Sequence, residues 1–194
     1  MKQKLINKLN KNKIEVSIKQ LLLAAGENPN REGLKNTPKR VAEFYSEILS
    51  GNTINPEDVL TVYYSKEDYE ELVLEKDISF YSLCEHHLLP FFGKIHIAYI
   101  PKKKRLLGIS KLARVVEVFS KRLQLQERLT KHIAEIIMKK AQPWGVMVVC
   151  EAEHLCLSMR GIKKPGHKIV TSCIRGIFAK DLRARMEVLQ LIKH

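Results

Sequence analysis

The stretch that decides the fold is Lys94-Ile95-His96-Ile97-Ala98-Tyr99-Ile100, which is bounded by a glycine and a proline. Ile95, Ile97 and Tyr99 alternate with other residues, and residues two apart share one face of a β-strand. The pattern therefore predicts a strand with one large apolar face. Further runs rich in β-forming residues precede it over residues 59–64, 71–74 and 78–83.

The segment after this strand has helical periodicity. Gly108-Ile109-Ser110 opens it, with Ser110 as the expected N-cap, and apolar residues then recur in two stripes. The register falters over residues 122–124, which predicts two consecutive helices rather than one rod. The chain then predicts strands over 146–157 and 169–178, a basic loop over 160–168, and a C-terminal helix from about Leu182.

The N-terminal part predicts a pair of helices. The first spans residues 14–25 and is ended by Gly26, and the second starts with Thr37 as N-cap and Pro38 as first helical residue. We expect residues 1–55 to form an N-terminal helical region. Residues 56–194 are expected to form one α+β domain, an antiparallel sheet with two consecutive helices packed on one face.

Composition and charge narrow the class of protein without choosing a partner. The chain is 45% apolar and 28% charged, as is usual for a soluble globular protein. It has no apolar run long enough to span a membrane and no apolar signal core at its start, so a cytoplasmic protein is expected. The net charge of +13 suits nucleic acid, a polyphosphate small molecule or a symmetric assembly with a charged cavity.

Two short segments supply the thiol and imidazole groups that bind zinc in proteins: Cys84, His86 and His87 in the first, His154 and Cys156 in the second. Cys84 and His87 are three residues apart, so a turn can direct both toward one point. His154 and Cys156 share a face if the strand predicted there is regular. The sequence therefore predicts a zinc group with either His154 or a water in the fourth position, and spacing alone leaves a structural and a catalytic site open.

Other residues have an ordinary and a chemical interpretation. Glu127 has Lys131 one helical turn on, which is typical of a surface ion pair, but its carboxylate also suits a guanine edge. His86 is either an exposed loop residue or an acid–base group, and Glu85 either orients the neighbouring ligands or is simply exposed. Solvated charge or phosphate contacts both fit Lys111, Arg114, Arg160, Lys163, Lys164 and Lys168.

From about Gly26 to its C-terminus the chain resembles the GTP cyclohydrolase I family. Five blocks carry the resemblance, in the order in which the family has them. They are Gly26–Pro29 with Arg31–Leu34 and Thr37–Arg40; Cys84–Phe91; Gly108–Arg114; Leu125–Thr130; and His154–Cys156 with Met159–Gly161.

The resemblance implies an enzyme that opens the five-membered ring of the guanine of GTP. Formate leaves, the ribose rearranges and the ring closes to 7,8-dihydroneopterin triphosphate, the first step of tetrahydrofolate and pterin biosynthesis. The resemblance assigns Zn²⁺ to Cys84, His87 and Cys156, with water as fourth ligand, and proton transfers to His86 and His154. It assigns substrate contacts to Ser110, Lys111, Arg114, Gln126, Glu127, Arg160, Lys168, Thr171 and Ser172, with Glu127 anchoring the guanine.

The resemblance also implies an assembly. The family has the tunnelling fold, in which sheets of several subunits join into a barrel, and its enzyme is a homodecamer of two pentamers with active sites at subunit interfaces. GTP and further copies of the chain are then the expected partners, with no nucleic acid and no membrane. The chain departs from the family at His167 and Ile169, where serine and threonine are common, and no role is carried over to His167.

Two other hypotheses make different predictions. A basic nucleic-acid-binding protein with a structural zinc would bind duplexes in a steeply salt-dependent manner and would have no use for Glu127. Another pterin-forming or deazaguanine enzyme of the same fold is the third hypothesis. Histidines in excess of a closed metal site, and the position of Glu127, favour the cyclohydrolase.

Overall fold

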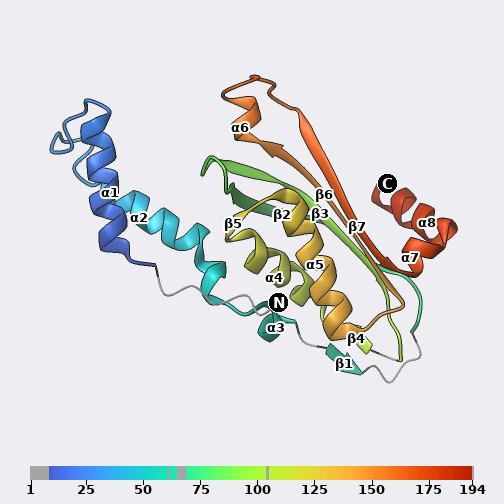
Figure 1. Cartoon of the computed structure of the whole chain (residues 1–194). Helices are drawn as coiled ribbons and strands as arrows, with labels where there is room; N and C mark the ends of the chain where they lie inside the picture. The colour runs from blue at the N-terminus through green and yellow to red at the C-terminus, as the bar shows by residue number, and fades with distance from the viewer. Residues whose placement is uncertain (1–8, 61, 65–68, 104, 194) are drawn as a thin grey trace.

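The computed structural model describes residues 9–60, 62–64, 69–103 and 105–193 (Figure 1). None of the described helices combines the length and apolar character that a bilayer span requires. The elements are α1 (Lys11–Ala24), α2 (Thr37–Ile48), the 3-10 helix η1 (Ser50–Thr53), α3 (Pro56–Val59), β1 (Val62–Tyr64), β2 (Val73–Cys84), β3 (Pro90–Ile100), β4 (Arg105–Leu107), α4 (Ile109–Ser120), β5 (Leu123–Gln124), α5 (Gln126–Ala141), β6 (Gly145–His154), α6 (Leu155–Ser158), β7 (Lys168–Gly176), α7 (Ile177–Lys180) and α8 (Leu182–Lys193).

The main sheet has the strand order β5-β2-β3-β6-β7. Its three long pairings are antiparallel, as predicted, and the short β5 runs parallel to the last two residues of β2. β3 and β6 pair without interruption from Phe91 opposite His154 to Ile100 opposite Gly145. This register places the end of β6 beside the hairpin that joins β2 to β3.

Helices cover both faces of this sheet (Figure 1). α4 and α5 lie on the face formed by Ile95, Ile97 and Tyr99, which are all buried in the main core. The predicted pair of consecutive helices on one face is therefore confirmed. The C-terminal helices α7 and α8, whose packing the sequence did not predict, lie over Ala98 and Met147 on the opposite face. Both faces of the central strands are apolar, so both need a cover.

The break between the two long helices is where the sequence predicts it. The buried guanidinium of Arg122 donates to the carbonyl oxygens of Val118 (3.1 Å) and Ile54 (2.9 Å). The buried amide of Gln124 donates to the carbonyl oxygen of Phe119 at 2.9 Å. These bonds replace the helical ones at the break and direct β5 against the end of β2.

Several predicted boundaries are wrong by a few residues. Gly108 is the N-cap of α4 and Ser110 is an exposed helical residue. Thr37 is the first residue of α2, not its cap. The strand predicted from residue 59 begins only at Val62, because Asn55 and the following proline start the short α3; Thr61 lies outside the described residues.

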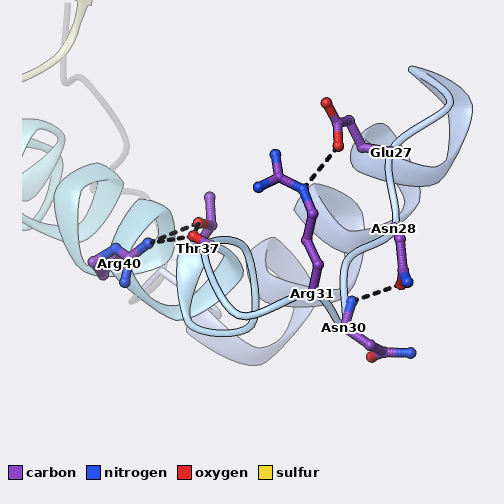
Figure 2. A network of polar contacts seen from close by, with 7 residues as sticks. Glu27, Asn28, Asn30, Arg31, Thr37 and Arg40 are labelled. Atoms are coloured by element: carbon purple, nitrogen blue, oxygen red, sulfur yellow. Dashed lines mark hydrogen bonds and ion pairs between the residues drawn. The ribbon is translucent and has the colours of Figure 1, made fainter.

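α1 and α2 pack against each other at one side of the sheet (Figure 1). Local polar contacts hold the loop between them, among them Arg31 Nε to Glu27 Oε2 at 3.0 Å and Arg40 Nη2 to Thr37 Oγ1 at 2.8 Å (Figure 2). No residue of α1, all of which the structure describes, is buried. The helical pair therefore contributes little to the core of the chain.

The backbone conformation of Gly176 and its close approach to Trp144 predict that a side chain at this position lowers stability. Gly176 joins β7 to α7 with φ 65° and ψ −134°, a conformation nearly restricted to glycine, and an added Cβ would lie 2.1 Å from the carbonyl oxygen of Trp144. We expect Gly176→Ala to lower the free energy of unfolding by about 3 kcal/mol. Gly26 also has positive φ, but nothing lies within 4 Å of its Cβ position, so Gly26→Ala should cost about 1 kcal/mol.

Urea unfolding of both variants and of the native chain at one protein concentration measures this difference, since the free energy of unfolding of an assembly depends on concentration. Equal losses for the two variants would show that the close approach at Gly176 has no effect.

Candidate active site

Three ligand groups converge at one end of the sheet. Cys84 ends β2, His87 follows it in the turn, and Cys156 comes from α6. One ligand atom from each lies within 4.8 Å of the other two, and the Cys84 Sγ to His87 Nδ1 distance is 3.8 Å. Both cysteines are buried, whereas His87 is exposed. The structure thus brings together the three residues for which the sequence predicts a zinc group.

The chemistry of these donors fits a bound cation. Burial raises the pKa of the Cys156 thiol, and the adjacent Cys84 thiol raises it further. The Cys156 thiol resists ionisation in this way, and a metal ion overcomes that resistance because it stabilises the thiolate. Two thiolates and one imidazole are ligands typical of zinc.

The turn after β2 forms because its backbone folds back on Cys84. The N–H of Cys84 donates to the carbonyl oxygen of Leu89 at 2.9 Å, and the N–H of Leu88 donates to the carbonyl oxygen of Cys84 at 2.8 Å. Leu88 has φ 55°, so it reverses the chain between β2 and β3. The reversal brings the ring of His87 back to the sulfur of Cys84.

The secondary-structure element that carries Cys156 differs from the prediction. β6 ends at His154, and Cys156 lies in the four-residue helix α6, so the argument from alternation along one strand is wrong. Ser158 Oγ donates to the carbonyl oxygen of His154 at 3.2 Å, which supports a helical turn here. Within the described residues, the three-ligand group does not include His154.

The imidazole of His154 is held on two sides. Its ring stacks on Phe91 with centroids 4.6 Å apart and an angle of 5° between the planes. Its Nε2 lies 2.7 Å from Oε1 of Gln126. Burial lowers the pKa of His154, and the nearby carboxylate of Glu127 opposes that shift. The ring is thus fixed and uncharged at rest near neutral pH.

The amide of Gln126 determines which nitrogen of His154 carries the proton. Its Nε2 donates to the carbonyl oxygens of Cys150 (3.0 Å) and Ile169 (2.9 Å), which can only accept. Oε1 therefore faces His154 as an acceptor. His154 must donate from Nε2, which leaves the lone pair on Nδ1.

Gln126 and Thr171 continue the hydrogen bonds of His154 into the chain; Gln126 is buried and Thr171 is half-buried. Gln126 is only 2% exposed, and its Nε2 is 3.2 Å from Oγ1 of Thr171. That hydroxyl also lies 2.7 Å from Oγ1 of Thr130 on α5. Both ends of the Gln126 amide are therefore engaged within the chain.

His86 and Glu127 remain accessible. His86 is exposed, with its ring centroid 6.2 Å from that of His87. Glu127 is exposed in the first turn of α5. Lys131 forms its ion pair with Glu135, at 3.7 Å, and not with Glu127. The interpretation of Glu127 as half of an i,i+4 ion pair is therefore wrong.

The residues predicted to contact ribose and phosphates are not gathered in one place by the single chain. Ser110, Lys111 and Arg114 lie in the first half of α4, whose last residue, Ser120, accepts a hydrogen bond from Ser82 Oγ near the metal group. A helix of 12 residues is about 18 Å long, so Ser110 and Lys111 lie at the end of α4 that is remote from Ser82, whereas Arg114 lines one groove with Leu83 and Pro90.

The remaining predicted contacts are also divided. Arg160 is exposed just after α6. Lys168 pairs with Glu151 at 2.7 Å. Lys168 and Ser172 occupy the face of β7 opposite to that of Thr171, because the parity along the strand differs. The structure therefore brings together the three candidate metal ligands and two further histidines, and it leaves most of the predicted phosphate contacts elsewhere.

One pair near the metal group was not predicted. The guanidinium of Arg128, on α5, makes two contacts with the carboxylate of Glu85: Nη1 to Oε2 at 2.6 Å and Nη2 to Oε1 at 2.8 Å. Arg128 lowers the pKa of Glu85, chiefly through these hydrogen bonds. The residue lies in the Leu125–Thr130 block, and only its position next to Glu127 distinguishes it in the sequence.

Comparisons with known proteins agree with this arrangement. The sequence model of the family described as GTP cyclohydrolase I matches residues 14–193. The GTP cyclohydrolase 1 of Clostridioides difficile (strain 630) is 59% identical over 187 residues, which cover 96% of this chain and 98% of the relative. The relative of the same name from Carboxydothermus hydrogenoformans is 57% identical, with 96% of each chain covered, and that from Bacillus subtilis (strain 168) is 55% identical, with 97% and 98% covered.

These matches extend across the helical N-terminal region, the sheet and every residue of the site, so the resemblance seen in the motifs holds for nearly the whole chain. The chain belongs to the GTP cyclohydrolase I family of metal-dependent hydrolases.

Proposed function

We propose that the chain carries out the GTP cyclohydrolase I reaction at a zinc centre formed by Cys84, His87 and Cys156. The reaction opens the five-membered ring of the guanine of GTP, releases formate and yields 7,8-dihydroneopterin triphosphate. One observation carries the proposal: three ligand atoms lie within 4.8 Å of one another, while His86 and His154 remain outside the group. A closed structural site has no need of two further imidazoles.

The three ligands leave the fourth position of a tetrahedral site for water, the pattern of a catalytic zinc. Zinc, when bound there, lowers the pKa of a water molecule to about 7 and so supplies the nucleophile that a poor electrophile such as purine C8 requires. Cys84 and Cys156 are buried whereas His87 is exposed, so we expect substrate to reach the site from the side of His87.

We assign the proton transfers to His154 and His86. The ring nitrogen next to C8 must be protonated as its bond to C8 breaks. Because Gln126 holds Nε2 of His154, Nδ1 is the atom that would take up the proton lost by the attacking water and pass it to this ring nitrogen. Stacking on Phe91 keeps the ring from turning. His86, exposed in the same turn, serves the later steps.

For the guanine we propose Glu127 as the anchor. Its carboxylate offers two acceptors to the two adjacent N–H donors of the guanine edge. The buried Gln126 and the half-buried Thr171 form the back of the pocket, and Gln126 acts there through His154. Ribose and triphosphate contacts are proposed for Ser110, Lys111, Arg114, Arg160, Lys168 and Ser172.

We propose that complete sites form between copies of the chain, in a homodecamer of two pentamers. β5 pairs with β2 at Leu83 and Cys84, which leaves residues 73–82 of β2 at one edge of the described sheet and β7 at the other. α4 packs on β2 and α5 on β7. Joining β2 of one copy to β7 of the next would bring α4 of the first copy toward α5 of the second. Repeating that contact closes a ring and forms the barrel of the tunnelling fold.

Surface features support such a contact. A groove of about 640 Å³ runs along β2 between α2 and α4, and apolar side chains such as Phe44 and Ile78 line it. Leu21 on α1 and Phe44 on α2 are about half exposed or more. We therefore propose that residues 1–55 serve mainly in assembly and residues 56–194 in catalysis.

Turnover of GTP tests the activity. We expect the zinc-loaded chain to release formate and to produce a dihydropterin chromophore from GTP. Cys156→Ser should lose both the metal and turnover, because a hydroxyl is a poor zinc ligand. Cys173→Ser, which changes a buried thiol outside the group, should keep both. Absence of formate with the zinc-loaded native chain would refute the proposal.

The guanine anchor is tested separately. Glu127→Ala should weaken GTP binding roughly 100-fold, because two hydrogen bonds to a charged group are lost, and zinc content should stay near that of the native chain. Calorimetric titration with GTP and metal analysis measure the two effects. Glu135→Ala removes an exposed carboxylate from the same helix and should bind GTP normally. Unchanged affinity in Glu127→Ala would show that the guanine lies elsewhere.

Mixed assemblies test whether sites are shared. Cys156→Ser and Arg114→Ala chains should each be inactive, and their co-expression should restore about a quarter of the sites, since one site in four combines two intact halves in a random ring. Co-expression of Cys156→Ser with Cys84→Ser should restore none, because both changes affect the same half. If mixed assemblies form and the first pair gains no activity, each chain holds a complete site.

A further inference from the structure

The turn that carries His87 is anchored at its first residue. The side chains of His86, His87 and Leu88 are all exposed. The N–H groups of His87 (3.3 Å) and Leu88 (2.8 Å) both donate to the carbonyl oxygen of Cys84, so their bonds stay within the turn. The direction of the His87 ring therefore depends on how the residue between Cys84 and His86 is held.

That residue, Glu85, is held from two directions by one segment of chain. Its N–H donates to the carbonyl oxygen of Gln124 in β5 at 3.0 Å. Its carboxylate receives two hydrogen bonds from Arg128, at 2.6 and 2.8 Å. The backbone contact fixes the position of Glu85, and the paired side-chain contact fixes its rotation.

The geometry of the ion pair suits this task. A guanidinium is planar and binds both oxygens of a carboxylate at once, which sets orientation as well as distance. The two side chains are about one-third exposed, so the pair adds little to global stability. Its main effect is on the placement of the turn.

The position of Arg128 on its helix also supports a role in placing the turn. It is the third residue of α5, where the positive end of the helix dipole disfavours a cation. Glu85 compensates this unfavourable position with a carboxylate from another element. A residue placed against the helix dipole and paired across 43 positions of sequence is better explained by a requirement of the turn than by helix stability.

We propose that Arg128 is a positioning residue for the metal centre. Acting through Glu85, it holds the turn so that Nδ1 of His87 and Sγ of Cys84 stay close enough together to bind one metal ion. The inference rests on the proposed function, because it takes Cys84, His87 and Cys156 as the metal ligands. It adds that metal affinity depends on a contact made by neither a ligand nor a substrate-binding residue.

Zinc affinity, measured on the full-length chain by competition with a chromophoric chelator, tests this inference without reference to activity. Arg128→Ala should raise the zinc dissociation constant tenfold to a hundredfold, the effect typical of losing a partner that orients metal ligands. Lys131→Ala, which removes an exposed cation from the same helix, should leave it unchanged. Arg128→Lys should recover little affinity, since an ammonium cannot hold both oxygens.

A double-variant cycle separates positioning from a general structural effect. Glu85→Ala should weaken zinc binding as much as Arg128→Ala does, and the double variant should be no weaker than either. Losses that add in the double variant, or an unchanged constant in Arg128→Ala, would overturn the inference. If Arg128→Ala fails to fold without metal, as judged by circular dichroism, Glu85→Gln tests the same contact at nearly constant shape.

Cobalt(II) gives a spectroscopic check on the same proteins. The native chain loaded with cobalt should show the ligand-field bands of a tetrahedral site with two thiolates, and Arg128→Ala should shift or broaden them because His87 no longer sits in one position. Identical spectra would count against the inference. A native chain that binds neither metal would instead refute the proposed function, so the two failures are distinguishable.

Discussion

The pairing of β3 with β6 is the constraint on which the rest of the structure depends. Ten residues of each strand pair without a bulge, ending where Phe91 meets His154. A slip of one residue would turn every side chain to the other face of the sheet. His154 would then leave Gln126, and the apolar residues of β6 that pack under α4 and α5 would leave that core. Core and site therefore share one register.

The start of α5 connects this register to the metal group. Gln126 reaches β6 and β7 and fixes the imidazole of His154, while Arg128 reaches the turn after β2. Glu127 lies between them and faces solvent. The side chains of these three successive residues point in three directions, because adjacent positions on a helix are about 100° apart. The proposed roles of proton transfer, guanine binding and metal placement all depend on one helical turn.

Much of the fold was predictable because it has a local signal. Alternation identified β3, and the faltering stripe identified the break between α4 and α5. The α6 turn was missed, since four residues are too short for any periodicity, and with it the true position of Cys156. The ligand types were predictable, but the partner of Arg128 was not, because a contact across 43 residues leaves no local pattern. In our proposal, Ser110 and Lys168 join a complete site only through contacts between copies of the chain. The sequence of one chain has no pattern that reports such contacts.

Within the described residues the sheet has two open edges, residues 73–82 of β2 and the strand β7, and these edges carry a liability apart from catalysis. Unpaired N–H and C=O groups along β2 and β7 are a template on which other extended chains can add, and such edges promote aggregation. Apolar side chains such as Val170, 61% exposed on β7, strengthen that tendency. In the proposed ring each edge is covered by another copy. Newly made chains would then be most vulnerable before they meet their neighbours, so the contact that completes the active site would also keep the protein in solution.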